Sequence, residues 1–230
     1  GLSRDKKDKY LEIIRKSGTR MLETLNDIID ISKIESGQLK ICNKPVRINL
    51  VLDEIYSSFF HRIRGDAPGQ KEVDFRLEKG TESMDFSIVT DGFRLSQVFN
   101  NLIGNAIKFT EEGHVHLKMS LHRINGQDFL DFSVRDTGIG ISPEQQRSIF
   151  NSFTQVDAGT TRKYGGTGLG LFIANKIAQQ VWRDRYGATH YHFVYQDTLF
   201  MVLDSEDSPR PDAPPEIKEA TKVYKRLQVE

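Results

Sequence analysis

Two glycine clusters within residues 136–171 place the strongest constraint on the fold of this chain. The first, Asp136-Thr-Gly-Ile-Gly140, follows residues 129–135, whose alternating apolar and polar side chains predict a half-buried strand. Glycines at 138 and 140 let a flat ligand approach the backbone, and the Asp136 carboxylate can accept a hydrogen bond from an exocyclic amine such as that of adenine. The pattern predicts a ligand-binding turn at the end of a strand.

The second cluster, Gly165-Gly-Thr-Gly-Leu-Gly-Leu171, opens an apolar pattern that predicts a helix to about Ala178. Backbone N–H groups at a helix N-terminus attract anions. Each cluster taken singly has an ordinary alternative. Asp-Thr-Gly is also the nucleophile triplet of aspartic proteases, and a glycine-rich turn often only connects a strand to a helix.

A pair of asparagines on a third predicted element, a helix over residues 94–110, favours the ligand-binding interpretation. Asn101 and Asn105 are four residues apart and share one face of a helix that is otherwise apolar on its inner side. Two amides on such a helix need polar partners, which are caps and water in the ordinary case. Here Asp136, Lys108 and the glycine-rich turn match the needs of phosphate and metal.

Four motifs in this order resemble the ATP-binding domain of sensor histidine kinases, within the superfamily of gyrase, Hsp90 and MutL ATPases. They are Asn101-x-x-x-Asn105 with Lys108-Phe109, Asp136-x-Gly138-x-Gly140, Phe150-Asn-Ser-Phe153 and Gly166-x-Gly168-x-Gly170. The resemblance implies an α+β fold, a two-layer α/β sandwich with helices on one face of a mixed sheet. ATP is then expected between the end of that sheet and the asparagine helix.

The resemblance also implies a role for each motif residue, with ATP and Mg²⁺ as cofactors. Asp136 receives the adenine amine, Asn101 helps to hold Mg²⁺, and Asn105 and Lys108 contact phosphate, so that Asn101 and Lys108 are the expected catalytic residues. The other expected nucleotide-binding residues are Phe109, Gly138, Gly140, Gly166, Thr167, Gly168, Leu169, Gly170 and, in a lid between Phe150 and Gly165, Arg162 and Lys163. For the two lid cations a solvated loop is an equal alternative.

The amide at position 101 bears on the type of reaction. Related hydrolytic ATPases place a Glu there, which can activate water as a general base, whereas an amide cannot take up a proton at neutral pH. We therefore expect weak hydrolysis and transfer of the γ-phosphate to an imidazole nitrogen supplied from elsewhere.

The chain begins with a predicted amphipathic helix over residues 3–36, with apolar residues spaced three and four apart. It would lie on its own domain or pack with another copy, and its length of about 50 Å favours a homodimer. The run to Leu39 resembles the second helix of the histidine kinase dimerisation hairpin, with Gly37 as the helix stop. The phosphoacceptor motif of the first helix is missing, because it fits none of the histidines at 61, 114, 116, 122, 190 and 192.

Three domains follow from this order: the dimerisation helix at 1–40, the ATP-binding domain at 41–204, and a Pro-rich linker with a short charged helix at 205–230. Within the second we predict strands at 45–50, 73–77, 86–89 and 114–121, and a helix at 51–60. After about residue 180 the chain departs from the family. Residues 181–195 and 198–203 are predicted strands and resemble a hairpin of calcineurin-like metallophosphoesterases without that family's metal motifs, so we hypothesise a fusion boundary near Gln180.

Charge and apolar content bear on two classes of partner, nucleic acid and membranes. Lys plus Arg and Asp plus Glu both number 32, so no basic field indicates nucleic acid, and any membrane contact is expected only through segments outside this sequence. We expect a cytoplasmic protein, or the cytoplasmic part of a membrane-bound bacterial sensor. The leading hypothesis is the catalytic portion of a dimeric histidine kinase that relays phosphate to a response-regulator receiver domain. A nucleotide-binding regulatory module without kinase activity and a metallophosphoesterase fragment are the alternatives.

Overall fold

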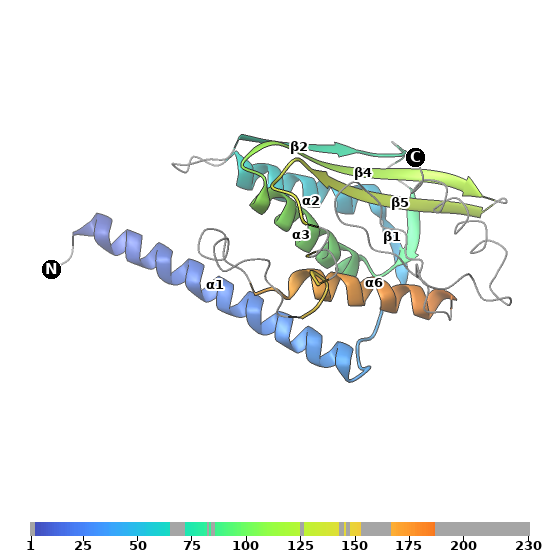
Figure 1. Ribbon diagram of the computed structural model, residues 1–230, viewed down its shortest axis with the longest axis horizontal. Helices are drawn as coiled ribbons and strands as arrows, with labels where there is room; N and C mark the ends of the chain where they lie inside the picture. The colour runs from blue at the N-terminus through green and yellow to red at the C-terminus, as the bar shows by residue number, and fades with distance from the viewer. Residues whose placement is uncertain are drawn as a thin grey trace.

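The protein has a sheet, a layer of helices beneath it, and a long N-terminal helix outside that layer (Figure 1). The computed structural model describes residues 3–64, 72–81, 83, 86–124, 127–142, 145, 148–152 and 167–186. The elements are α1 (Arg4–Glu35), β1 (Lys44–Arg47), α2 (Ile48–Ile63), β2 (Glu72–Glu78), β3 (Ser87–Thr90), α3 (Gly92–Phe109), β4 (Glu112–Ile124), β5 (Gln127–Asp136) and α6 (Gly170–Tyr186).

The main sheet has the order β2-β4-β5, with β2 parallel to β4 and β4 antiparallel to β5. Its alternate side chains Phe75, Val115 and Leu117 are buried in one core with residues of α2 and α3. On the opposite face Glu78 Oε1 lies 2.6 Å from Lys118 Nζ, and this contact lowers the pKa of Glu78. A mixed sheet with helices on one face confirms the predicted α+β sandwich.

Within the described residues, helix α1 contacts α3 and α6 through residues of its C-terminal half, such as Asp30 and Ile31. Gly37, at φ +66°, ends the helix as predicted, since its N–H bonds Ile34 O at 3.1 Å and Gln38 N–H bonds Lys33 O at 2.8 Å. Ile31 then joins a second apolar cluster with α6. The N-terminal half of α1 projects away from the domain (Figure 1). Along most of its length the helix leaves an apolar stripe exposed, namely Tyr10, Leu11, Ile13, Ile14, Met21, Leu22, Leu25, Ile28 and Ile29.

Two predicted strands were wrong in part because tertiary contacts extend helices into them. Residues 48–50 belong to α2, not to the strand at 45–50: Ile48 is fully buried, and Asn49 Nδ2 donates to Thr81 O and Ser83 O at 2.8 Å each. Residues 181–186 are the last turns of α6, not a strand, since Val181 packs four positions after Ile177 in the second apolar cluster.

The predicted elements after Tyr186, including the strand at 198–203 and the segment 205–230, lie outside the described residues. No helix in the described ranges is long and apolar enough to cross a bilayer.

Candidate functional site

The Asp136 turn is fixed against the C-terminal end of α3. Asp136, the last residue of β5, accepts a hydrogen bond at Oδ1 from Gly138 N at 2.9 Å, and Ile139 N donates to Phe109 O at 3.3 Å. A Cβ at position 138 would lie 2.6 Å from Phe109 O, so only glycine fits without a backbone shift. Gly140 follows with φ +76°. The structure therefore brings the first glycine cluster and Phe109 together.

Thr137 supports this turn from the other side and was not singled out from the sequence. Its N–H donates to His114 O at 3.1 Å, and its Oγ1 accepts from His114 N at 3.0 Å. Gly113, at φ +120°, lies directly against the Thr137 hydroxyl. The sequence shows only a hydroxyl residue between Asp136 and Gly138. Its role is visible only once the neighbouring strand brings His114 into hydrogen-bonding distance.

The first residue of the asparagine pair, Asn101, lies beside the second glycine cluster. Asn101 and Asn105 are both half-buried on α3. Gly170 opens α6 directly beside the first of them, because a Cβ at position 170 would lie 2.7 Å from Asn101 Oδ1 and 3.2 Å from Asn101 Cγ. The Asn101 amide therefore lies beside the N-terminus of α6, where α3 packs on α6.

Lys108 and Phe109 form the last turn of α3. Lys108 Nζ lies 4.7 Å from the centre of the Phe109 ring. The helix then ends at Thr110, which is fully buried and donates from Oγ1 to Ala106 O at 2.8 Å. One helix therefore presents Asn101, Asn105, Lys108 and the Phe109 carbonyl along the site.

The described part of the second cluster runs from Thr167 to α6. Leu169 N donates to Thr167 Oγ1 at 3.3 Å, Gly168 has φ +71°, and the Leu169 side chain is buried in the second apolar cluster. Thr167 Oγ1 also donates to Asp27 Oδ2 of α1 at 3.4 Å. The predicted residues Arg162, Lys163 and Gly166, and the second phenylalanine of the Phe150–Phe153 motif, lie outside the described residues.

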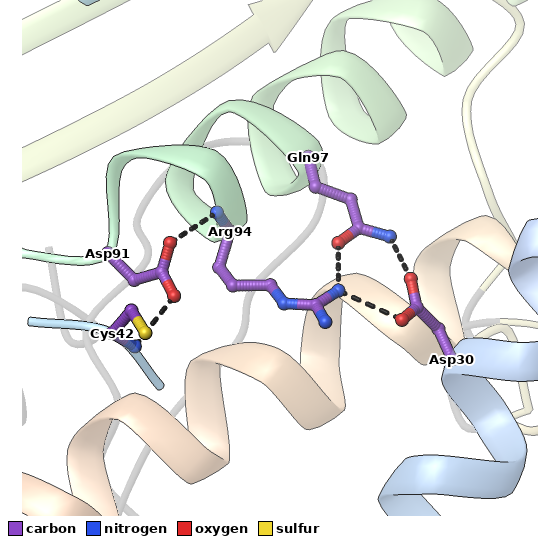
Figure 2. A network of polar contacts seen from close by, with 5 residues as sticks. All are labelled: Asp30, Cys42, Asp91, Arg94 and Gln97. Atoms are coloured by element: carbon purple, nitrogen blue, oxygen red, sulfur yellow. Dashed lines mark hydrogen bonds and ion pairs between the residues drawn. The ribbon is translucent and has the colours of Figure 1, made fainter. Parts of the chain in front are cut away.

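A polar network joins α1 to the start of α3 (Figure 2). Asp91 caps α3 by accepting from Arg94 N at 3.1 Å, and its second oxygen accepts from Cys42 N at 2.8 Å. Asp30 accepts from Arg94 Nη1 at 3.0 Å and from Gln97 Nε2 at 2.7 Å. We did not predict these residues from the sequence; an acidic residue before the helix and two carboxylates three apart on α1 were the available signals.

A hollow of about 490 Å³ lies elsewhere, between the end of α2 and β2. It is lined by Phe60, Ile63, Arg64, Glu72, Val73, Asp74 and Phe75, so no motif residue contributes to it. The motif residues instead surround the region between the Asp136 turn, α3 and the start of α6.

Comparison with known proteins agrees with this arrangement. Residues 90–201 match the family described as histidine kinase-, DNA gyrase B- and HSP90-like ATPase. The signal transduction histidine-protein kinase BarA of Escherichia coli K12 is 34% identical over 176 residues, which cover 76% of this chain and 18% of BarA. Hybrid signal transduction histidine kinase A of Dictyostelium discoideum is 37% identical over 187 residues, which cover 78% of this chain and 8% of that protein.

A comparison of structures also finds a histidine kinase. The crystal structure of full-length ShkA in complex with AMPPNP superposes with a TM-score of 0.59 at 27% identity, over 87% of this chain and 38% of ShkA. In sequence, the chain spans less than a fifth of the length of BarA. Residues 90–201 of this chain therefore belong to the histidine kinase-, DNA gyrase B- and HSP90-like ATPase family, and the chain is similar in sequence and fold to histidine-protein kinases.

Proposed function

We propose that this site binds ATP with Mg²⁺ and that the chain is the catalytic portion of a protein-histidine kinase. The observation that carries the proposal is the double role of α3. Its Phe109 carbonyl holds the Asp136 turn, while its Asn101 side chain lies against Gly170 at the N-terminus of α6. The turn whose carboxylate is proposed to bind adenine and the helix end proposed to bind phosphate thus both lie against one helix.

Each residue then has a role that its chemistry permits. Asp136 accepts a hydrogen bond from the adenine amine, and Phe109 lines the pocket together with Gly138 and Gly140. Asn105 and Lys108 contact phosphate, as do the backbone groups from Gly166 to Gly170, and Asn101 holds Mg²⁺. Mg²⁺, when bound, neutralises and polarises the phosphates. Arg162 and Lys163 are proposed to close on the terminal phosphates. The AMPPNP complex of ShkA supports ATP as the ligand.

The site residues favour transfer over hydrolysis. Asn101 supplies an amide where water activation would need a carboxylate, and we propose no other general base there. Asn101 and Lys108 therefore position the γ-phosphate for an incoming imidazole. The names of BarA and the Dictyostelium relative support a histidine acceptor, which we propose is carried by a segment outside this sequence.

The exposed stripe of α1 supports a homodimer formed through this helix. Met21 is 72% exposed and Ile14 is 65% exposed on this amphipathic helix, and within the described residues neither belongs to a buried apolar cluster. A second copy would cover them.

We further propose a division of the chain into residues 1–40, 41–204 and 205–230 and a cytoplasmic location. As partners we propose a response-regulator receiver domain, which would receive the phosphate, and no nucleic acid.

Calorimetric titration with an ATP analogue and Mg²⁺ tests the pocket. The parent is expected to bind, and Asp136→Asn is expected to lose at least tenfold in affinity because an amide nitrogen or oxygen no longer offers a charged acceptor. Glu12→Gln on exposed α1 is the matched control. No binding by the parent would overturn the proposal.

Transfer is tested separately with γ-labelled ATP and an added helical hairpin that carries an acceptor histidine. Acid-labile label on the hairpin supports a kinase. Nucleotide binding without transfer would instead favour a regulatory nucleotide-binding module.

A further inference from the structure

Two carboxylates on one face of α1 reach the proposed nucleotide site. Asp30 bonds Arg94 and Gln97 near the start of α3, one turn before Asn101. Asp27, one turn earlier on α1, accepts from the Thr167 hydroxyl in the second glycine cluster at 3.4 Å. Helix α1 is therefore in polar contact with α3 and with the turn that leads into α6.

The two carboxylates differ in how their charge is balanced. The Asp30 and Arg94 side chains are only 13% and 12% exposed and form an ion pair. Among the described residues Asp27 has the Thr167 hydroxyl and no ion pair. Burial raises the pKa of Asp27; the Thr167 hydrogen bond lowers it, and the charges of Asp30 and Glu23 raise it again. The surroundings of Asp27 thus disfavour its ionised form. The ion pair of Asp30 with Arg94 holds this part of α1 in place.

That charge lies close to the anion-binding end of α6. Thr167 precedes Gly170, the first residue of α6, by three positions, a chain length of at most about 11 Å. Its Oγ1 also accepts from Leu169 N at 3.3 Å, so the hydroxyl that binds Asp27 belongs to the same turn that leads into the helix. Charges about 10 Å apart interact at low ionic strength and are screened at high salt.

We propose that Asp27 opposes the nucleotide phosphates, so that α1 seated on Thr167 weakens the binding of phosphate-bearing ligands. The inference rests on the proposed nucleotide site. By thermodynamic linkage, a bound nucleoside triphosphate weakens the seating of α1 by the same factor. Asp27 is a positioning residue in this scheme: it acts on phosphate affinity through its charge and through Thr167.

The experiment compares the parent chain with Asp27→Asn, which removes the charge and keeps an oxygen that can accept from Thr167. Calorimetry with Mg²⁺ is carried out for adenosine and for a non-hydrolysable ATP analogue, each at low salt and at high salt. Glu23→Gln is the matched control, because Glu23 is an exposed carboxylate one turn earlier on the same helix. At low salt we expect Asp27→Asn to bind the ATP analogue about threefold more tightly or better.

The same variant is expected to bind adenosine like the parent, and its advantage for the ATP analogue is expected to vanish at high salt. A contact that only supports the fold would change both ligands alike and would not respond to salt. Equal or weaker binding of the ATP analogue by Asp27→Asn at low salt, with a parent that binds, would overturn this inference alone. A parent and variant that bind neither ligand would overturn the proposed function as well.

Discussion

Replacement of Gly170 by alanine separates the nucleotide site from the stability of the fold. The new Cβ would lie 2.7 Å from Asn101 Oδ1 and 3.7 Å from Asn101 Cβ. The closest atom is the tip of a side chain, which can rotate, so the backbone of α3 need not move. The substitution is therefore expected to displace the Asn101 amide and to leave the packing of α3 on α6 intact.

Two opposing terms set the expected change in stability, and the loss of one ligand sets the expected change in affinity. Moving Asn101 off its preferred rotamer costs about 0.5–1.5 kcal/mol, while alanine in a helix is favoured over glycine by up to about 1 kcal/mol. The free energy of unfolding should then change by less than about 1 kcal/mol. Loss of the amide as a ligand of Mg²⁺ should cost about 1.5–3 kcal/mol of binding, or at least about tenfold in affinity.

Urea unfolding measures the stability, and calorimetry with an ATP analogue, with and without Mg²⁺, measures the affinity. Gly18→Ala on α1 is the control, because a Cβ at position 18 meets nothing within 4 Å. It should leave affinity unchanged. If Gly170→Ala bound the analogue within twofold of the parent in the presence of Mg²⁺, the assignment of Asn101 to the site would be refuted.

Three further predictions concern the turn, the α1 contact and the second apolar cluster. Gly138→Ala places a Cβ 2.6 Å from the Phe109 carbonyl oxygen, a backbone atom that cannot rotate away, so it should destabilise the protein by about 1–3 kcal/mol in urea and abolish adenosine binding; parental stability would contradict the docked turn. Because the pKa of Asp27 is raised above its ordinary 3.8, its contribution to stability is complete below that pH and is lost as the pH rises through the raised value. Asp27→Asn should therefore melt at a higher temperature than the parent at neutral pH, with a difference that shrinks toward pH 4, and a difference independent of pH would argue against the titration of Asp27. Ile173→Ala, at a fully buried position between α6 and the end of α1, should cost about 2–5 kcal/mol in urea unfolding, and a loss below 1 kcal/mol would mean that the cluster relaxes to fill the cavity.

Much of the fold could be predicted because its signals are local. The spacing of apolar residues in α1, the alternation in β2 and β4, and the helix stop at Gly37 each depend on neighbours within a few positions. The two errors at residues 48–50 and 181–186 arose in short segments whose residue pattern fits a strand or a helix equally well. There the hydrogen bonds of buried Asn49 and the packing of partly buried Val181 favour the helix.

The sequence by itself determined the motif residues and their chemistry, because these follow from residue type and spacing. They are a carboxylate at 136, amides at 101 and 105, and glycines at 138 and 170. Only the tertiary structure decided which of these meet. The contact of Asp27 with Thr167 spans 140 positions and that of Arg94 with Asp30 spans 64. Periodicity shows which face of a helix is buried but not which partner covers it, so the position of α1 against the proposed nucleotide site follows from packing alone.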